Sequence, residues 1–268
     1  MNSRRFEKLK IVFDIEVQPN VENYQLGQVV LEQVVQLGGL TDIHALRTVF
    51  ELMQRLGVPL ELKENGMGNP ISVESYLKQV EKQGKWSRPI EAGGLRFHFG
   101  RMPALKQAFI SIEDVSADST LDWVEWVKPF LADHSFVQAW VSDVEYDYWQ
   151  NAKDPLEYDA AGRSYSHLPT KSNGLPVPLE QIEIDTSNNS GRWSLQSGYV
   201  EAVGSIMWLG QLFWRRVGEN RKEALLSSSW LNVQLVGNSV IQVIASDHCF
   251  CDETTDVIQN NLRAILYA

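Results

Sequence analysis

The chain has 268 residues, which is enough for one large domain or two small ones with an ample core. Its composition is ordinarily globular, with 44% hydrophobic and 22% charged residues. The net charge of −10 and the pI near 5.0 argue against direct binding to nucleic acid or to an anionic membrane, because both repel an acidic surface.

The cysteine content and the first residues of the chain indicate the cellular compartment. Cys249 and Cys251 are the two cysteines, and they provide no disulfide framework. Residues 1–10 carry charges without an uninterrupted apolar run behind them, and no segment reaches the length of a membrane span. We therefore expect a soluble, cytoplasmic protein.

The first forty residues predict a strand followed by a helix. Residues 9–17 alternate between polar and apolar side chains, as a strand does. Apolar residues at helical spacing predict a helix over 24–37 that ends at Gly38 and Gly39, since glycine takes a left-handed cap conformation without steric cost. This helix is expected to pack against the next one as an antiparallel pair.

Two further helices and a boundary are expected before residue 95. Thr41 and Ser72 are the predicted N-caps, and the helix after Ser72 ends at Gly84. The prolines and glycines of 84–94 are typical of a boundary. They divide the chain into an N-terminal α/β subdomain (1–90) and a C-terminal α+β subdomain (91–268), or they mark a loop in one compact domain.

The middle of the chain predicts strands, a helix and a long loop. Short runs rich in apolar residues predict strands at 95–99, 106–112, 136–142 and 180–185. Aromatic and apolar residues predict a helix over roughly 120–131. Prolines, glycines and serines between 154 and 178 predict a long exposed loop.

The C-terminal part predicts a buried helix, a hairpin and a final helix. Residues 199–217 have apolar side chains at helical spacing on all sides. Two alternating runs around Gly237 and Asn238 predict a β-hairpin, and a last amphipathic helix follows. The whole pattern predicts an α+β fold with a mixed or antiparallel sheet, packed helices, and a C-terminal β-hairpin followed by a helix.

The charge is concentrated in residues 113–159. This stretch holds twelve acidic residues and two lysines, so its net charge equals that of the whole chain, and it also holds nine of the 27 aromatic residues. If residues 143–148 are extended, Asp143, Glu145 and Asp147 share one face, and the aromatic side chains share the other. Such a segment is either a solvated face over a core or a surface for a basic partner.

Two constellations are candidates for metal chemistry. The cluster at 247–252 contains His248, Cys249 and Cys251, but zinc sites usually have a wider cysteine spacing and a second ligand pair elsewhere. The three carboxylates of 143–147 would suit magnesium or calcium only with ligands from another element. No Gly-x-Ser-x-Gly motif supports a serine nucleophile. These residues therefore predict a protein that is not an enzyme and needs no cofactor.

Residues 199–218 contain the segment Trp-Leu-Gly-Gln-Leu-Phe-Trp. This segment resembles the Trp-Leu-Gly-x-x-Phe-Trp segment of bacterial immunity proteins from polymorphic-toxin and type VI secretion systems. These proteins are paired with nuclease toxins of a restriction-endonuclease-like fold, and the resemblance covers roughly residues 100–268. The Trp123-Val-Glu125-Trp126 run approximates the family's Trp-Glu pair.

The resemblance implies a cytoplasmic antitoxin that neutralises its cognate toxin by direct protein–protein occlusion. A nuclease cleft is basic, and an acidic, aromatic surface is its physical complement. A metal-dependent enzyme and a secretion adaptor or chaperone remain the alternatives. The expected partner-binding residues lie within 143–159: Asp143, Glu145, Tyr146, Asp147, Tyr148, Trp149, Asp154, Glu157, Tyr158 and Asp159.

Overall fold

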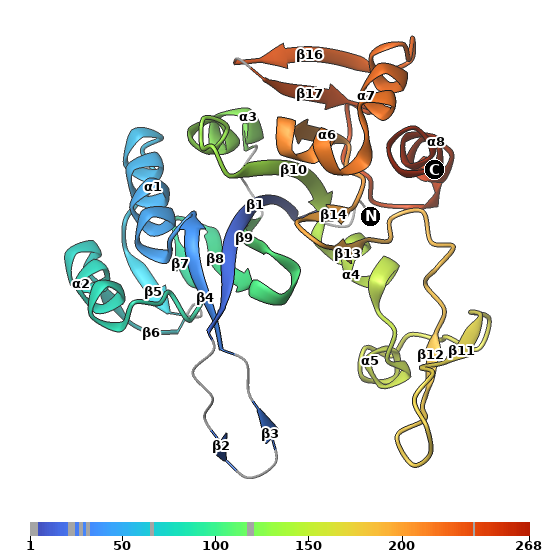
Figure 1. The fold of residues 1–268 in the computed structure, drawn as a ribbon, viewed down its shortest axis with the longest axis horizontal. Coiled ribbons are helices and arrows are strands. Elements are labelled where there is room, and N and C mark those ends of the chain that lie inside the picture. Colours follow the sequence, from blue (N-terminus) through green and yellow to red (C-terminus); the bar gives the residue numbers. More distant parts are fainter. Residues whose placement is uncertain are drawn as a thin grey trace.

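The computed structural model describes residues 5–20, 25–26, 29–30, 33–64, 67–116, 121–237 and 239–268 (Figure 1). Its strands are β1 (Glu7–Asn20), β2 (Gln25–Leu26), β3 (Val29–Val30), β4 (Gln33–Gly39), β5 (Leu62–Glu64), β6 (Met67–Ile71), β7 (Ile90–Ala92), β8 (Leu95–Met102), β9 (Gln107–Asp114), β10 (Phe136–Asp143), β11 (Thr170–Ser172), β12 (Ile182–Ile184), β13 (Ser194–Gln196), β14 (Tyr199–Glu201), β15 (Ile206–Leu209), β16 (Asn232–Val236) and β17 (Val240–Ile244). Its α-helices are α1 (Asp42–Arg55), α2 (Val73–Gln83), α3 (Trp123–Val127), α4 (Val144–Asn151), α5 (Pro155–Ala160), α6 (Gln211–Val217), α7 (Glu219–Leu226) and α8 (Asp256–Tyr267).

A large antiparallel sheet organises the described part of the chain, and β1 is its central strand. The order is β16-β17-β15-β10-β1-β9-β8-β7-β5-β6, and β4 pairs with the second half of β1. Residues 8–13 of β1 lie between β9 and β10, with Leu9 opposite both Ile112 and Val141. Helices packed on a sheet of antiparallel pairs confirm the predicted α+β class, and the β16–β17 hairpin followed by α8 confirms the predicted C-terminus.

The sheet separates two hydrophobic cores because alternate side chains of a strand point to opposite faces. Leu9, Ile11 and Phe13 of β1 belong to the core covered by α1, α2 and α3. Val12 belongs to the second core, which contains residues of α6, α7 and α8. Figure 1 shows α1 and α2 at the left of the molecule, α6 near its centre, and α7 and α8 towards the right. The predicted division at residue 90 stays a prediction, and β7, which begins there, pairs with both β5 and β8.

Two predicted helices are wrong. The helix expected over 24–37 is replaced, within the described residues, by the short strands β2 and β3 and by β4, which pairs with β1. Four valines in this stretch are β-branched, and their strand preference outweighs the helical spacing. The helix expected over 199–217 is divided into β14, β15 and α6, with Gly210 as the N-cap of α6.

Gly204 shows why that helix does not form. A Cβ atom at this position would lie 2.5 Å from the carbonyl oxygen of Val141 and 3.0 Å from Cβ of Trp140, so the backbone passes directly against β10. The residues before Gly210 are thus held as a strand that is buried on both faces, and its apolar run mimics a buried helix.

We predict that Gly204→Ala lowers the free energy of unfolding by roughly 1–3 kcal/mol, because the added methyl group overpacks a rigid contact. Urea unfolding measures the change. Gly38→Ala is the matched control, since its Cβ would meet no atom closer than 3.4 Å. Equal effects of the two substitutions would contradict the steric explanation.

Candidate functional site

A groove of about 800 Å³ lies where helix α4 approaches β1 and β9, and we call it the acidic groove. Its lining residues are Lys8, Glu113, Val144, Glu145, Asp147, Tyr148, Asn151, Ala152, Lys153, Asp154, Glu157 and Trp193. Five carboxylates thus face two amines, and four of the five come from the predicted partner-binding residues. The groove also carries two aromatic side chains, Tyr148 and Trp193.

The acidic groove is built differently from the expected extended run. The prediction that residues 143–148 are extended is wrong, because residues 144–151 form helix α4. Asp143 is the N-cap, and its carboxylate accepts a hydrogen bond from the amide of Tyr146 at 2.7 Å. An aspartate cap followed by Glu145 and Asp147 in the first turn favours a helix start, and this outweighs the two-residue alternation. The three carboxylates therefore do not share one face.

Each of these three carboxylates has a different environment. Asp143 is buried, and burial raises its pKa, although amide hydrogen bonds from Tyr146 and Glu145 oppose the shift. Asp147 pairs with Lys8 at 2.5 Å, and both side chains are largely buried. Glu145 is exposed and pairs with Arg163 at 2.5 Å. Each of the three carboxylates is thus already paired with a cation or a backbone amide of the protein itself.

The free negative charge of the groove lies on and beside α5. Asp154 caps this helix by accepting a hydrogen bond from the Leu156 amide at 2.9 Å. Within the described ranges, Asp154, Glu157 and Asp159 make no ion pair. Partial desolvation raises the pKa of Tyr148, and the neighbouring Glu157 carboxylate raises it further because it disfavours a second negative charge. These three carboxylates are the ones available to a cationic partner.

The predicted aromatic anchors are mostly packed inside the protein. Tyr158 is 5% exposed, and its ring lies 4.8 Å from the Trp149 ring and 5.9 Å from that of Tyr165, measured between centroids. The hydroxyl of Tyr146 lies 3.2 Å from Ser190 Oγ and accepts a hydrogen bond from Gln259. Tyr148 is 46% exposed. Of the four rings, Tyr148 is the one that the fold leaves open.

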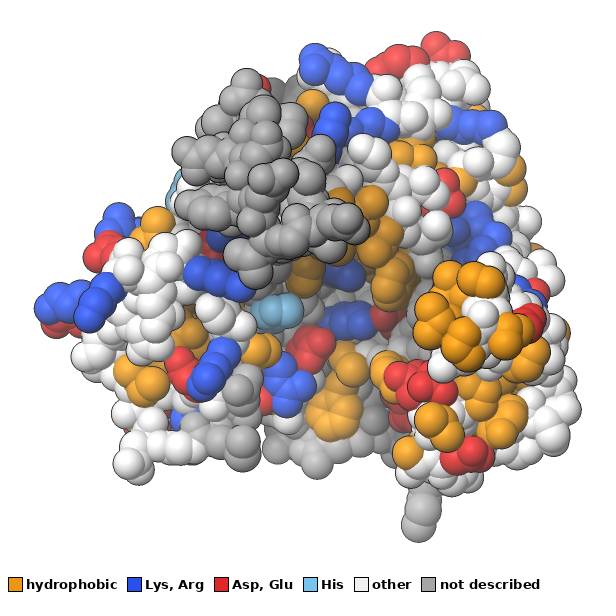
Figure 2. Space-filling model, turned by 60° about the horizontal axis from the view of Figure 1, so that its bottom comes forward, with side chains coloured by type: hydrophobic (Ala, Val, Ile, Leu, Met, Phe, Trp, Pro, Cys, Tyr) orange, Lys and Arg blue, Asp and Glu red, His pale blue; other side chains and the backbone are white. Residues whose placement is uncertain are grey.

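Sequence reasoning missed a group of exposed aliphatic side chains next to the acidic residues. The segment 154–185 contains α5 and the β11–β12 hairpin, whereas the sequence predicts a loop over 154–178 and a strand over 180–185. Its exposed large aliphatic residues are Leu156, Leu175, Val177, Leu179 and Ile182. Figure 2 shows hydrophobic side chains gathered on the lobe at the right, with acidic side chains among them. The signal in the sequence is the alternation Leu-Pro-Val-Pro-Leu at 175–179, which predicts an extended segment without a buried face.

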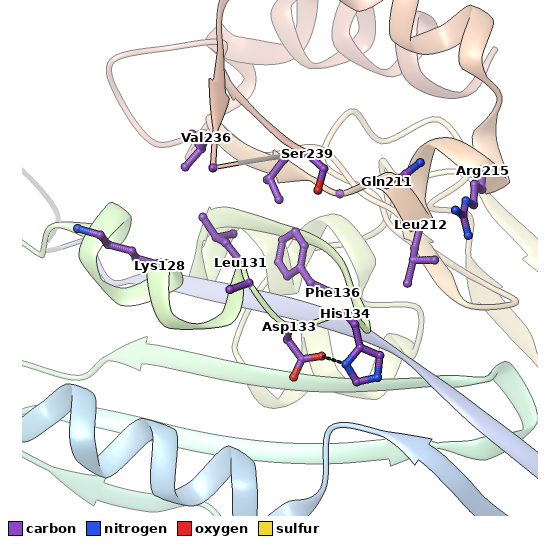
Figure 3. A pocket seen from close by; sticks show the side chains of 14 residues that line it. Lys128, Leu131, Asp133, His134, Phe136, Gln211, Leu212, Arg215, Val236 and Ser239 are labelled. Carbon is purple, nitrogen blue, oxygen red and sulfur yellow. Dashed lines mark ion pairs between the residues drawn. The ribbon is translucent and has the colours of Figure 1, made fainter.

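A second hollow of about 640 Å³ lies between β10, α6 and the β16–β17 hairpin (Figure 3). Lys128 and Arg215 lie at opposite ends of it, with Leu131 and Phe136 between them. Lys128 pairs with Glu125, and His134 lies 3.7 Å from Asp133. The hollow is thus mainly apolar with cations at its ends, which is the opposite charge character to the acidic groove.

The cluster at 247–252 does not assemble a metal site from several elements. Among the side chains that the structure describes, no three His, Cys, Asp or Glu come together as metal ligands. Cys249 is buried, His248 is exposed, and Cys251 lies beside its neighbour Asp252, with 3.7 Å between sulfur and carboxylate oxygen. Burial raises the pKa of both thiols.

We expect the two cysteines to react at very different rates. Cys249 is largely desolvated and Cys251 is partly exposed, so Cys251 should react with a thiol reagent at least about a hundredfold faster at mildly alkaline pH. Mass spectrometry of partially labelled protein assigns the modified residue. Equal labelling in the native state would show that residues 247–252 open more readily than this packing implies.

None of the described helices combines the length and the apolar character needed to cross a bilayer. No protein family and no curated protein matches the sequence. Among solved structures, the chain is similar to the Pseudomonas aeruginosa T6SS protein PA0821, with 12% sequence identity and a TM-score of 0.47. The alignment covers 98% of this chain and 73% of that chain. The resemblance of residues 199–218 to immunity proteins stays a prediction.

Proposed function

We propose that this chain is an immunity protein that binds a secreted nuclease toxin and blocks it by protein–protein occlusion. The observation that carries the proposal is a set of carboxylates that make no ion pair with any described residue: Asp154 and Glu157 at the acidic groove, and Asp159 nearby on α5. A nuclease must hold a polyanion, so its cleft presents lysines and arginines. Carboxylates that make no ion pair with a described residue are suited to meet those cations in place of the nucleic acid.

The remaining groove residues have a supporting role in this proposal. Lys8 and Arg163 neutralise Asp147 and Glu145, so these two carboxylates fix the position of α4 rather than contact the toxin. Tyr148, which is exposed at the groove, supplies a ring of the kind that dominates binding energy in protein interfaces. A stable inhibitory complex would bury on the order of 1,600 Å² in total.

Co-expression with the protein encoded by the adjacent gene tests the function. We expect that protein to stop bacterial growth and to degrade nucleic acid when produced alone, and both effects to disappear when this chain is present. The purified pair should form a complex whose affinity falls as salt is added, because exposed charges are screened.

Two other outcomes would replace the proposal. If the neighbouring protein binds this chain and remains lethal, the chain is an adaptor or chaperone that loads an effector. If the neighbouring protein is harmless and the purified chain holds a stoichiometric metal ion, the metal-dependent enzyme becomes the better explanation.

A further inference from the structure

The β11–β12 hairpin is an arm that carries apolar side chains into solvent. Strands β11 and β12 pair with Thr170 opposite Ile184, and residues 173–181 form the tip. Figure 1 shows the arm projecting away from the main sheet. Val177 at the tip is 80% exposed, and Leu175, Leu179 and Ile182 are each more than half exposed. An arm of this kind has apolar surface that its own chain does not cover.

The tip is ordered by its own hydrogen bonds. The side-chain oxygen of Asn173 accepts hydrogen bonds from the amides of Leu175 and Gln181, and its side-chain nitrogen donates to the carbonyl of Leu179. Asn173 also pairs through its backbone amide with the carbonyl of Gln181. Pro176 and Pro178 further restrict the backbone. The apolar side chains are therefore held in place before any partner arrives, which lowers the entropic cost of binding.

The base of the arm is joined firmly to the acidic groove. Ile184 is buried in a small core with Ala152 and Tyr158. Its amide donates to the carbonyl of Lys153, which lines the groove. Lys171 pairs with Asp185 at 2.8 Å, and this interaction lowers the pKa of Asp185 to about 2. A partner that contacts α5 would therefore meet the arm at a defined position.

The charges around the arm define the partner's chemistry. Residues 152–185 hold six carboxylates and three basic residues, and two of the basic ones, Arg163 and Lys171, are paired within the protein. Glu180, at the end of the tip, and Glu183, on β12, flank the apolar side chains. Neither glutamate makes an ion pair among the described residues. An apolar tip with this border is complementary to an apolar pocket with a basic rim.

We propose that the arm inserts its tip, Leu175, Val177 and Leu179, into an apolar pocket bordered by lysine and arginine on the partner protein. This inference rests on the proposed function, because it takes the partner to be the protein that the acidic groove binds. The carboxylates of the groove then accelerate association by electrostatic steering. The buried apolar contact of the arm slows dissociation of the complex. Two of the aromatic rings that the sequence suggests as anchors, Trp149 and Tyr158, instead pack in the small core with Ile184 at the base of the arm.

The test uses the full-length chain and the protein encoded by the adjacent gene as the probe. The triple variant Leu175→Ser, Val177→Ser and Leu179→Ser should raise Kd at least about tenfold, mainly through faster dissociation, with an unchanged salt dependence. Leu235→Ser is the matched control, because Leu235 is 68% exposed on β16, outside the arm. Circular dichroism confirms that both variants are folded, and sedimentation of the free chain reports self-association.

The outcomes separate the two proposals. If the arm variant binds the probe like the wild type while neutralised groove carboxylates slow association, the arm inference is wrong and the proposed function stands. If neither set of variants changes binding, the arm and the acidic groove are both wrong as docking surfaces, and if the probe does not bind at all, the proposed function fails as well. If the free chain is a dimer that the arm variant converts to a monomer, the arm's occupant is a second copy of this chain, which overturns the inference.

Discussion

Replacing Asp154 by Asn, Glu157 by Gln and Asp159 by Asn is expected to slow association with the basic partner by about 30-fold at low ionic strength, since electrostatic steering contributes about 10- to 1,000-fold to association rates. These carboxylates make no ion pair with the residues that the structure describes, so their charge is available to a partner. Asparagine caps a helix as well as aspartate does, so the variant keeps α5 intact. The dissociation rate should change little, and the rates of wild type and variant should converge in high salt.

A matched control distinguishes local charge from total charge. Glu51, Glu61 and Glu223 are exposed and lie outside the groove. Their replacement by Gln also removes three negative charges, so the net charge of this control equals that of the groove variant. Association rates measured by stopped-flow fluorescence over a range of salt should remain close to wild type for this control. If the two triple variants slow association equally, the effect belongs to the net charge of −10 and the acidic groove is not the docking site.

The sequence predicts those parts of the fold in which one local signal acts alone. The alternation Leu-Arg-Phe-His-Phe identifies β8, and cap residues place the starts of α1 and α2 at Thr41 and Ser72. Where two signals compete, the prediction is wrong. A buried strand and a buried helix have the same apolar run over residues 199–209, and a close backbone contact at Gly204, which no local pattern reveals, decides between them.

The sequence shows how many carboxylates lie between 113 and 159, but it does not assign their roles. Three of them have a local structural role. Asp122, Asp143 and Asp154 accept hydrogen bonds from first-turn amides and begin α3, α4 and α5. Which carboxylates remain free depends on cations that come from distant parts of the chain, as Lys8 does for Asp147. No local sequence pattern reveals this pairing, because the two residues are far apart in the chain.

Asp147→Ala should lower the free energy of unfolding by about 3 kcal/mol, because removal of one member of a largely buried ion pair leaves the other charge without compensation. The side chains of Lys8 and Asp147 are 16% and 12% exposed, so water replaces little of the lost interaction. Lys10 adds to the effect. Burial lowers its pKa, the Asp147 charge opposes this shift, and the centroids of the Phe109, Trp140 and Trp193 rings lie 5.1 to 5.7 Å from its ammonium nitrogen.

A double-mutant cycle isolates this pair. Lys8→Met should cost less than Asp147→Ala, because methionine keeps an aliphatic stem in the same space. The double variant Lys8→Met, Asp147→Leu should unfold within about 1 kcal/mol of the wild type, since apolar residues of similar volume often replace a buried ion pair without loss. Urea unfolding provides the free energies. If Asp147→Ala leaves stability unchanged and instead weakens partner binding, Asp147 faces the partner, as the extended arrangement of residues 143–148 would require.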